Sequence, residues 1–198
     1  MRNAMIFWCT GLSGAGKTAI AVESKKHLEA IGLALMVVGG DKVRASYGEK
    51  LGFGRSDVEK NNLHIVSICE AERKNYDIII VSAISSIDHA RKIAREKLEP
   101  FFYLIYLSCE IDSLKKRDPK GLYGKADRGQ IVGLIGYSAS NPYDVPMDAD
   151  FTLNTTPPAT LEVSGRLLLG LLIKKFSRLG LSPGNRKLSQ VGCIRRGW

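Results

Sequence analysis

The most informative stretch of this sequence is Gly11-Leu12-Ser13-Gly14-Ala15-Gly16-Lys17-Thr18, which matches the pattern GxxxxGK[ST] of a phosphate-binding loop. The stretch follows an apolar run at 5–9 and opens an amphipathic run at 17–30, so it lies between an expected strand and an expected helix. Glycines let backbone N–H groups point inward around phosphates, and the helix N-terminus adds the positive end of its dipole. A glycine-rich turn without a ligand is the weaker alternative, because both spacing and context agree with the motif.

Two side chains of this loop have distinct expected roles. Lys17 would neutralise the β- and γ-phosphates of a nucleoside triphosphate, and the Thr18 hydroxyl would ligate Mg²⁺, the expected cofactor. We also expect the Lys17 side chain to be solvated in the empty loop, so that its removal leaves the fold intact.

Outside the loop, short apolar runs alternate with amphipathic stretches, which predicts an α/β fold with a parallel sheet. Strands are expected at 5–9, 33–38, 78–84, 101–107 and 151–153, and helices at 17–30, 57–74, 87–98, 111–117 and from Pro157 to about 176. The run 78–84 is apolar enough to be buried on both faces of the sheet. The expected architecture is a five-stranded, mainly parallel sheet with helices on both faces.

The segment 120–146 has no sustained period and contains five glycines, at 121, 124, 129, 133 and 136. A loop this long inside a compact domain is usually functional, and a lid is the common case. We therefore expect one domain over 1–177, with a glycine-rich lid at about 118–146, and a basic, mobile tail over 178–198.

The composition is that of a globular protein with an excess of positive charge. Lys and Arg number 29 against 20 Asp and Glu, which gives a net charge of +9. Seven basic residues and no acidic one lie from Lys174 to the end, so the rest of the chain has 22 basic against 20 acidic residues. The excess charge therefore belongs to the tail and says little about the site.

Cysteine usage and hydropathy indicate a cytoplasmic protein. Four widely spaced cysteines, Cys9, Cys69, Cys109 and Cys193, show no zinc-ligand spacing and are expected to be reduced thiols. The apolar runs near either end of the chain are too short for a signal peptide or a membrane span. We expect small-molecule nucleotides as partners, a homodimer as a possible assembly, and neither membrane nor nucleic acid.

Further blocks of sequence resemble one particular kinase family. Behind GLSGAGKT come Gly40-Asp41-Lys42-Val43-Arg44, Leu51-Gly52-Phe53, Ala83-Ile84-Ser85 and the block 117–123, RDPKGLY. In this order they resemble the adenylylsulfate kinase family, with its DGDxxR, LGF, AFIS-like and RDxKGLY segments, over about residues 6–154. The resemblance implies a P-loop kinase fold, and transfer of phosphate from ATP with Mg²⁺ to the 3′-hydroxyl of adenosine 5′-phosphosulfate.

The resemblance also implies roles for single residues. Asp41 would lie near the acceptor hydroxyl and the metal, and could take or orient the hydroxyl proton; a helix cap is its alternative role. Arg44 would clamp an anionic group of the acceptor. Phe53 would stack on the base, and Asn61 would contact the acceptor; a core aromatic and a solvated amide are the respective alternatives.

Residues of the later blocks complete the expected site. Arg117 is expected to bind ATP, and Lys120 the acceptor. Both, with Lys125, would place positive charge near the transferring phosphoryl group as the lid closes, or would simply form a solvated face. Ser85 is expected to contact the acceptor and is a possible phosphoserine, as in some family members, while capping of the following helix is its simpler role.

The sequence departs from the family at several acceptor-site positions. The departures are Gly39, Val58, Leu63, His64, Ser86-Ile87-Asp88, Asp127, Val132 and Leu134. Loss of arginine at position 58 and of a lysine and an aromatic ring at 132 and 134 predicts weaker use of adenosine 5′-phosphosulfate than in a family member with all motifs. A 3′-hydroxyl kinase for another nucleotide-linked acceptor, such as cytidine diphosphoramidate in capsule biosynthesis, remains the alternative.

Two function classes other than catalysis are also open. A non-catalytic nucleotide-binding regulator would not need Lys17, Thr18 and Asp41 together, and turnover with any acceptor would exclude it. A nucleic-acid binder could use the basic tail, but the tail has no recognition motif and Trp198 as its one aromatic residue.

Overall fold

The computed structural model describes residues 3–47 and 51–178. Its sheet contains the strands β1 (Met5–Thr10), β2 (Leu35–Gly39), β3 (Ile78–Ser82), β4 (Phe102–Ser108) and β5 (Phe151–Asn154). The strands are all parallel and lie in the order β2-β3-β1-β4-β5. The expected five-stranded P-loop kinase sheet is therefore confirmed, and the central strand is the one that leads into the phosphate-binding loop.

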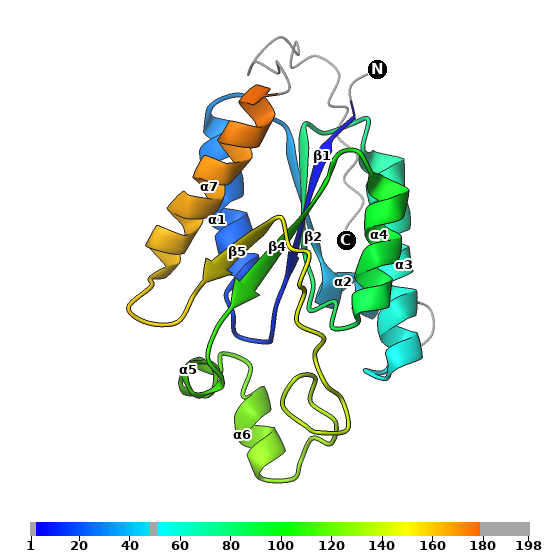
Figure 1. Ribbon diagram of the computed structural model, residues 1–198, viewed down its shortest axis with the longest axis vertical. Helices are drawn as coiled ribbons and strands as arrows, with labels where there is room; N and C mark the ends of the chain where they lie inside the picture. The colour runs from blue at the N-terminus through cyan, green and yellow to red at the C-terminus, as the bar shows by residue number, and fades with distance from the viewer. Residues whose placement is uncertain (1–2, 48–50, 179–198) are drawn as a thin grey trace.

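Helices cover both faces of the sheet (Figure 1). They are α1 (Lys17–Ala30), α2 (Gly40–Ala45), α3 (Arg55–Glu72), α4 (Asp88–Leu98), α5 (Ile111–Arg117), α6 (Leu122–Asp127) and α7 (Leu161–Arg178). Helices α1 and α7 pack on one face, and α3 and α4 on the other. Helices α5 and α6 lie beyond the carboxyl ends of the strands, where a lid would be placed.

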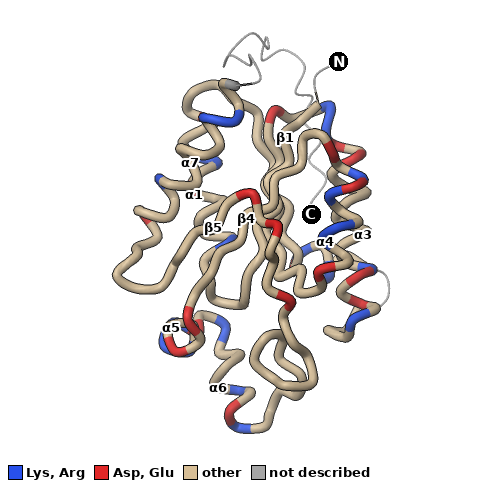
Figure 2. Tube along the Cα trace, viewed as in Figure 1, with Lys and Arg blue, Asp and Glu red and all other residues tan. Residues whose placement is uncertain are grey.

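The two-sided burial of β1 explains why its sequence shows no polar alternation. Phe7 packs in a core with residues of α1 and α7, whereas Ile6 and Trp8 pack in a second core with residues of α3 and α4. Successive side chains of a strand point to opposite faces of the sheet, and at β1 the side chains on both faces are buried. Figure 2 shows that none of the five strands carries a charged residue.

Three expectations about elements need correction. The last helix begins at Leu161 and not at Pro157, because the Thr160 hydroxyl accepts a hydrogen bond from the Val163 N–H (3.2 Å), as a helix cap does. Helix α6 lies inside the segment expected to be irregular, and the short helix α2 was not expected. The tail from residue 179 onward lies outside the described residues.

The cysteines and the hydropathy of the helices can be described within these ranges. Cys9, Cys69 and Cys109 are free thiols, and burial raises the pKa of Cys9 and of Cys69 to about 12. Over residues 3–47 and 51–178, no helix has the length and apolar character that crossing a bilayer requires.

Candidate active site

The phosphate-binding loop joins β1 to α1 in a conformation that two of its glycines make possible. Gly16 precedes α1 with φ +89°, in the left-handed region. Gly11 has φ +146°, and a Cβ there would lie 2.5 Å from the carbonyl oxygen of Leu107 on β4. A side chain at either position would strain the backbone, and at Gly11 it would also collide with the neighbouring strand.

The Lys17 side chain is buried, so the expectation of a solvated lysine is wrong. Its residue is 9% exposed, and its Nζ donates to the carbonyl oxygens of Gly11 and Leu12, both at 2.8 Å. Because the loop turns back on itself, these two carbonyl oxygens lie within hydrogen-bonding distance of the ammonium group at the start of α1. Burial lowers the pKa of Lys17 to about 8, while the nearby charge of Asp41 opposes the shift.

This lowered pKa predicts proton uptake when ATP binds at alkaline pH. At pH 9 the ligand-free lysine, with its pKa of about 8, is mostly neutral. The negative phosphates favour the ammonium form and raise the pKa, so binding draws close to one proton from the buffer. Titration calorimetry at pH 9 in buffers of different ionisation enthalpy should show this proton. At pH 6.5 the lysine is already charged and should contribute none. A buffer-independent enthalpy at pH 9 would contradict the lysine's assigned position.

Oxygen donors near the loop fit a magnesium ion. The Thr18 hydroxyl lies 2.7 Å from the Ser82 hydroxyl at the carboxyl end of β3, and the exposed Asp41 carboxylate lies near enough to act on Lys17. Hydroxyl and carboxylate oxygens are ligands that Mg²⁺ accepts, and this ion keeps most other positions for water and phosphate oxygens. Such an ion does not need a full set of protein ligands. In the described ranges, no cluster of three or more His, Cys, Asp or Glu side chains could hold a metal by itself.

Asp41 contacts Lys120 from the lid segment. The carboxylate of Asp41 accepts a hydrogen bond and ion pair from the Lys120 ammonium, and both side chains are more than half exposed. Asp41 lies in the first turn of α2 and makes no capping hydrogen bond, since the N-cap residue is Gly39. The helix-cap alternative for Asp41 is therefore wrong, and the structure brings together two residues that lie 79 positions apart.

A hollow beside Asp41 gathers most of the expected acceptor residues. It is lined by Gly40, Asp41, Arg44, Phe53, Val58, Asn61, Asn62, Ala83, Ile84, Ser85 and Ile135. The guanidinium of Arg44 lies over the Phe53 ring, 4.9 Å from its centre, and donates to the Gly52 carbonyl oxygen. Phe53 is not a core residue, because 57% of it is exposed.

Ser85 lines the same hollow but is buried. It is 3% exposed and has φ +47°, and its hydroxyl lies between Trp8 and the amide of Asn62. A protein kinase could not reach this hydroxyl without opening the core, so the geometry does not support the phosphoserine role. No side-chain bond caps α4, whose N-cap residue is Ile87.

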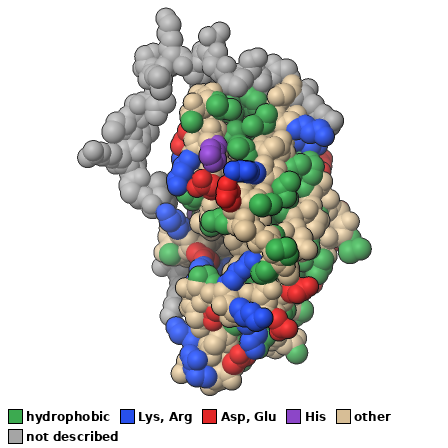
Figure 3. All heavy atoms as spheres, turned by 90° about the vertical axis from the view of Figure 1, so that its left-hand side faces the viewer, with side chains coloured by type: hydrophobic (Ala, Val, Ile, Leu, Met, Phe, Trp, Pro, Cys, Tyr) green, Lys and Arg blue, Asp and Glu red, His purple; other side chains and the backbone are tan. Residues whose placement is uncertain are grey.

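A second hollow lies on the other side of the loop. It is lined by Gly14, Ala15, Gly16, Ile20, Arg117, Thr155, Ala159, Thr160, Leu161 and Ser164. Arg117 lines this hollow and donates to the Thr155 carbonyl oxygen, and its role in binding ATP stays a prediction. Lys and Arg side chains gather on the lower part of this face of the molecule (Figure 3), where α5, α6 and the segment between them contribute five basic residues.

A hydrogen bond connects the lid segment to the phosphate-binding loop, and an ion pair connects it to α5. The Tyr123 hydroxyl donates to the Ser13 carbonyl oxygen (2.9 Å), and Asp127 pairs with Lys115 (2.8 Å). Asp127, one of the departures from the family, therefore serves to hold α6 against α5. Lys125 is exposed.

The other departures lie in different surroundings. Val58 lines the acceptor hollow, as the sequence argument required. Val132 is 91% exposed and Leu134 is buried in the core, and neither lines the hollow. His64 packs edge-on against Tyr47 at 4.9 Å. The argument that residues 132 and 134 weaken acceptor binding is therefore wrong in its geometry, whereas Val58 lies in the hollow and its effect on acceptor binding stays a prediction.

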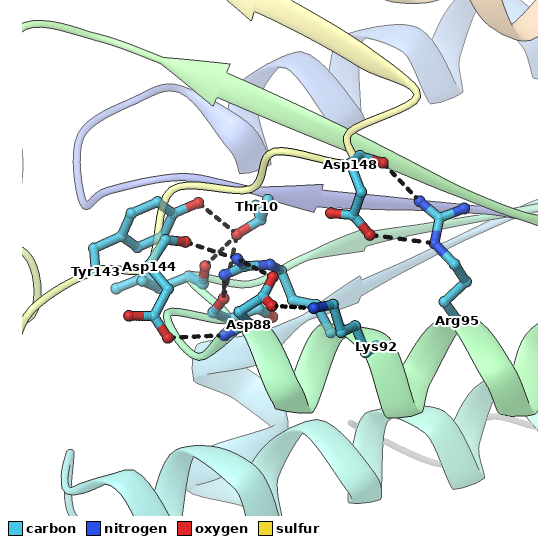
Figure 4. A network of polar contacts seen from close by, with 10 residues as sticks. Thr10, Asp88, Lys92, Arg95, Tyr143, Asp144 and Asp148 are labelled. Atoms are coloured by element: carbon cyan, nitrogen blue, oxygen red, sulfur yellow. Dashed lines mark hydrogen bonds and ion pairs between the residues drawn. The ribbon is translucent and has the colours of Figure 1, made fainter.

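A network of polar contacts joins β1, the start of α4 and the end of the lid (Figure 4). Arg91 on α4 is 2% exposed and donates to the carbonyl oxygens of Ser85 and Asp144, both at 2.7 Å. The Asp144 carboxylate in turn accepts from the Asp88 N–H at the start of α4 (3.0 Å). Beside it, the Tyr143 and Thr10 hydroxyls lie 2.8 Å apart, so the lid's end is tied to β1 as well.

Replacing Arg91 by methionine should destabilise the protein by about 3 kcal/mol, because it removes a buried, charged donor to the Ser85 and Asp144 carbonyl oxygens and to the Asp88 carboxylate. Urea unfolding followed by circular dichroism measures this change. Lys92→Met is the matched control: Lys92 is exposed on the same helix and pairs with the same Asp88. We expect the control to unfold at a midpoint close to that of wild type. Equal midpoints for the two variants would show that Arg91 does not hold the lid.

Several residues of the two hollows were not anticipated from the sequence. In the acceptor hollow these are Gly40, Asn62, Ala83, Ile84 and Ile135, and in the second hollow Ile20, Thr155, Ala159, Thr160, Leu161 and Ser164. One of them could have been expected from the sequence: Thr160 is a residue type that often caps a helix, and it stands three positions before Val163. The rest become neighbours only through the fold.

Comparison with known proteins gives concordant results. A family model described as adenylylsulphate kinase matches residues 3–154. A probable adenylyl-sulfate kinase of Pyrococcus abyssi is 35% identical over 179 residues, which are 89% of this chain and 97% of the relative. The structure resembles that of a Mycobacterium tuberculosis APS kinase in complex with AMPPNP and APS, with a TM-score of 0.80, 28% identity, and coverage of 87% of this chain and 99% of that one. A gluconokinase of Sinorhizobium meliloti, 17% identical, shares the fold with a TM-score of 0.60 over 91% of this chain and 98% of its own.

Proposed function

The chain belongs to the adenylylsulphate kinase family, and from this membership we propose that it phosphorylates the ribose 3′-hydroxyl of adenosine 5′-phosphosulfate, giving 3′-phosphoadenylyl sulfate. Members of this family are ATP-dependent kinases that transfer phosphate to a hydroxyl group, and this chain is one of them. The observation that carries the proposal is the presence of two hollows, one lined by Gly14–Gly16 of the phosphate-binding loop and the other, the acceptor hollow, lined by Asp41.

In the proposed reaction, ATP lies in the hollow bordered by Arg117, with its phosphates against the backbone N–H groups of the loop. Lys17 exchanges its contacts with the Gly11 and Leu12 carbonyls for contacts with the phosphates. Thr18 and Asp41 would hold Mg²⁺, which supplies positive charge to the phosphates when bound. These residues position the γ-phosphoryl group at the border between the two hollows.

The acceptor nucleotide lies in the other hollow, with its base on the Phe53 ring and Asn61 and Ser85 beside it. Arg44 and Lys120 supply positive charge to its anionic group. Asp41 orients the 3′-hydroxyl and takes its proton. A bond forms between the 3′-oxygen and the γ-phosphorus, the bond from that phosphorus to the β–γ bridging oxygen breaks, and ADP leaves. Lid residues around α6 exclude water from the transfer.

A steady-state comparison of acceptors tests the substrate. With saturating Mg·ATP, we expect adenosine 5′-phosphosulfate to be turned over in a saturable manner, and cytidine 5′-diphosphate derivatives to be turned over at least tenfold less efficiently. Turnover of the cytidine derivatives alone would replace the proposed acceptor. Absence of turnover with every acceptor, in a protein that binds ATP, would favour the non-catalytic alternative.

A further inference from the structure

Two neighbouring amides of α3 lie buried in the acceptor hollow with unused hydrogen-bonding atoms. Asn61 is 4% exposed and Asn62 is 2% exposed, and both line the hollow. The Asn61 Oδ1 and the Asn62 Nδ2 have no hydrogen-bond partner in the described parts of the chain. Buried polar atoms in native proteins are nearly always paired, so a ligand is the natural partner for these two.

The orientation of the Asn62 amide is fixed by a relay that begins at Trp8. The indole Nε1–H of Trp8 can only donate, and it donates to the Ser85 hydroxyl oxygen (2.9 Å). The proton of that hydroxyl therefore points to the Asn62 Oδ1 (3.1 Å). With its oxygen engaged in this way, the Asn62 amide offers its NH₂ group, a donor, to the hollow.

The neighbouring amide is oriented in the opposite sense. The Asn61 Nδ2 lies 3.4 Å from the Gly40 carbonyl oxygen, which can only accept, so the amide nitrogen faces Gly40. The Asn61 Oδ1 therefore remains as an acceptor. The hollow thus presents one neutral donor and one neutral acceptor from adjacent residues.

The surroundings of the pair suit a flat, uncharged ring. Arg44 is the one cation among the residues that line the hollow, and its guanidinium is engaged with the Phe53 ring and the Gly52 carbonyl. Val58 and Ile135 make part of the wall apolar, and Phe53 offers an exposed ring face. A nucleobase has an edge with a donor beside an acceptor and faces that stack on aromatic rings.

We propose that Asn62 is a specificity-determining residue: its amide NH₂, held by the Trp8–Ser85 relay, donates to the base edge of the acceptor nucleotide. This inference rests on the proposed function and deepens it, because it names the group that selects the base. A fixed donor pairs with an acceptor on the base edge and is left without a partner where the base presents a donor at that place.

Paired nucleotides of equal size and charge test this reading. Adenosine and inosine 5′-monophosphates present reversed orders of donor and acceptor, as do cytidine and uridine 5′-monophosphates. Titration calorimetry in the presence of Mg·ADP, which occupies the phosphate-binding loop, measures their dissociation constants. We expect wild type to bind one member of at least one pair about tenfold more tightly than the other.

Variants then assign the preference to Asn62. Asn62→Leu, which keeps the volume but removes the donor, should reduce the preference to within about twofold. Ser85→Ala, which releases the amide from the relay, should also reduce it while the amide remains present. Asn75→Leu, a change of the same kind outside the hollow, should leave the preference intact. Affinity for Mg·ADP and the unfolding midpoint, measured for each variant, verify that the fold is retained.

Two results would overturn the inference. One is wild-type binding of both members of both pairs within twofold. The other is a preference that survives unchanged in Asn62→Leu and in Ser85→Ala. A protein that phosphorylates adenosine 5′-phosphosulfate but gives either result would keep the proposed function and lose this inference.

Discussion

Replacing Lys17 by methionine is expected to lower turnover by about 10³-fold. The substitution removes the charge that stabilises the transferring phosphoryl group, and removal of one such donor costs about 10²–10³-fold in mutant enzymes. Methionine is chosen over alanine because Lys17 is buried and a shorter side chain would leave a gap. A radiometric assay with γ-labelled ATP has the sensitivity to follow this loss.

The structure also changes what Lys17→Met should do to stability. The variant removes both hydrogen bonds to the Gly11 and Leu12 carbonyls and a buried charge at once, so we expect a small shift in unfolding midpoint of either sign. Lys26→Met on the same helix is the matched control, because Lys26 is exposed and pairs with Glu23. If Lys17→Met kept a rate within a few-fold of this control, the assignment of the loop lysine would be wrong.

Replacing Asp41 by asparagine should cut turnover by about 10²–10⁴-fold, the usual cost of losing a general base. The change is nearly isosteric but removes the negative charge that the acceptor proton and the metal need. Asp41 is exposed and caps no helix, so we expect little change in the unfolding midpoint. Measured kcat, together with the KM for ATP, separates loss of chemistry from loss of nucleotide binding.

Asp112→Asn, at an exposed aspartate in the first turn of α5, is the control for this substitution. We expect it to keep the wild-type rate. Should Asp41→Asn keep its kcat and raise only the KM for ATP, Asp41 would be a metal or nucleotide contact and not the group that acts on the acceptor hydroxyl.

The sequence was sufficient for the fold because its strands are nearly uniform apolar runs and its loop motif is specific. Hydropathy predicts the ends of β1, β3 and β4 to within about two residues, because both faces of the sheet are covered by helices and the strands are therefore apolar throughout. The start of α7 was misplaced because Pro157 and Pro158 looked like a first helical turn, whereas Thr160 is the residue that caps. Helix α2 was missed because six residues are too few for a periodic pattern.

The site was predictable where a motif fixed the residue and not where tertiary contacts did. Asp41, Arg44, Phe53 and Asn61 line one hollow as their motifs implied. The burial of Lys17 depends on carbonyls that only the folded loop presents. Leu134 belongs to the core and Ile135 lines the hollow, a difference of one position that no pattern in the glycine-rich segment could reveal.

The most direct test of the account is the identification of the product. Purified protein with Mg·ATP and adenosine 5′-phosphosulfate should yield a nucleotide whose new phosphoryl group is on the 3′-oxygen, seen by coupling of its phosphorus to the proton on the 3′-carbon in nuclear magnetic resonance spectra. The 3′-deoxy analogue of the acceptor should give no product under the same conditions. A phosphate on any other atom, equal turnover of the 3′-deoxy analogue, or no transfer to adenosine 5′-phosphosulfate at all would contradict the proposed function.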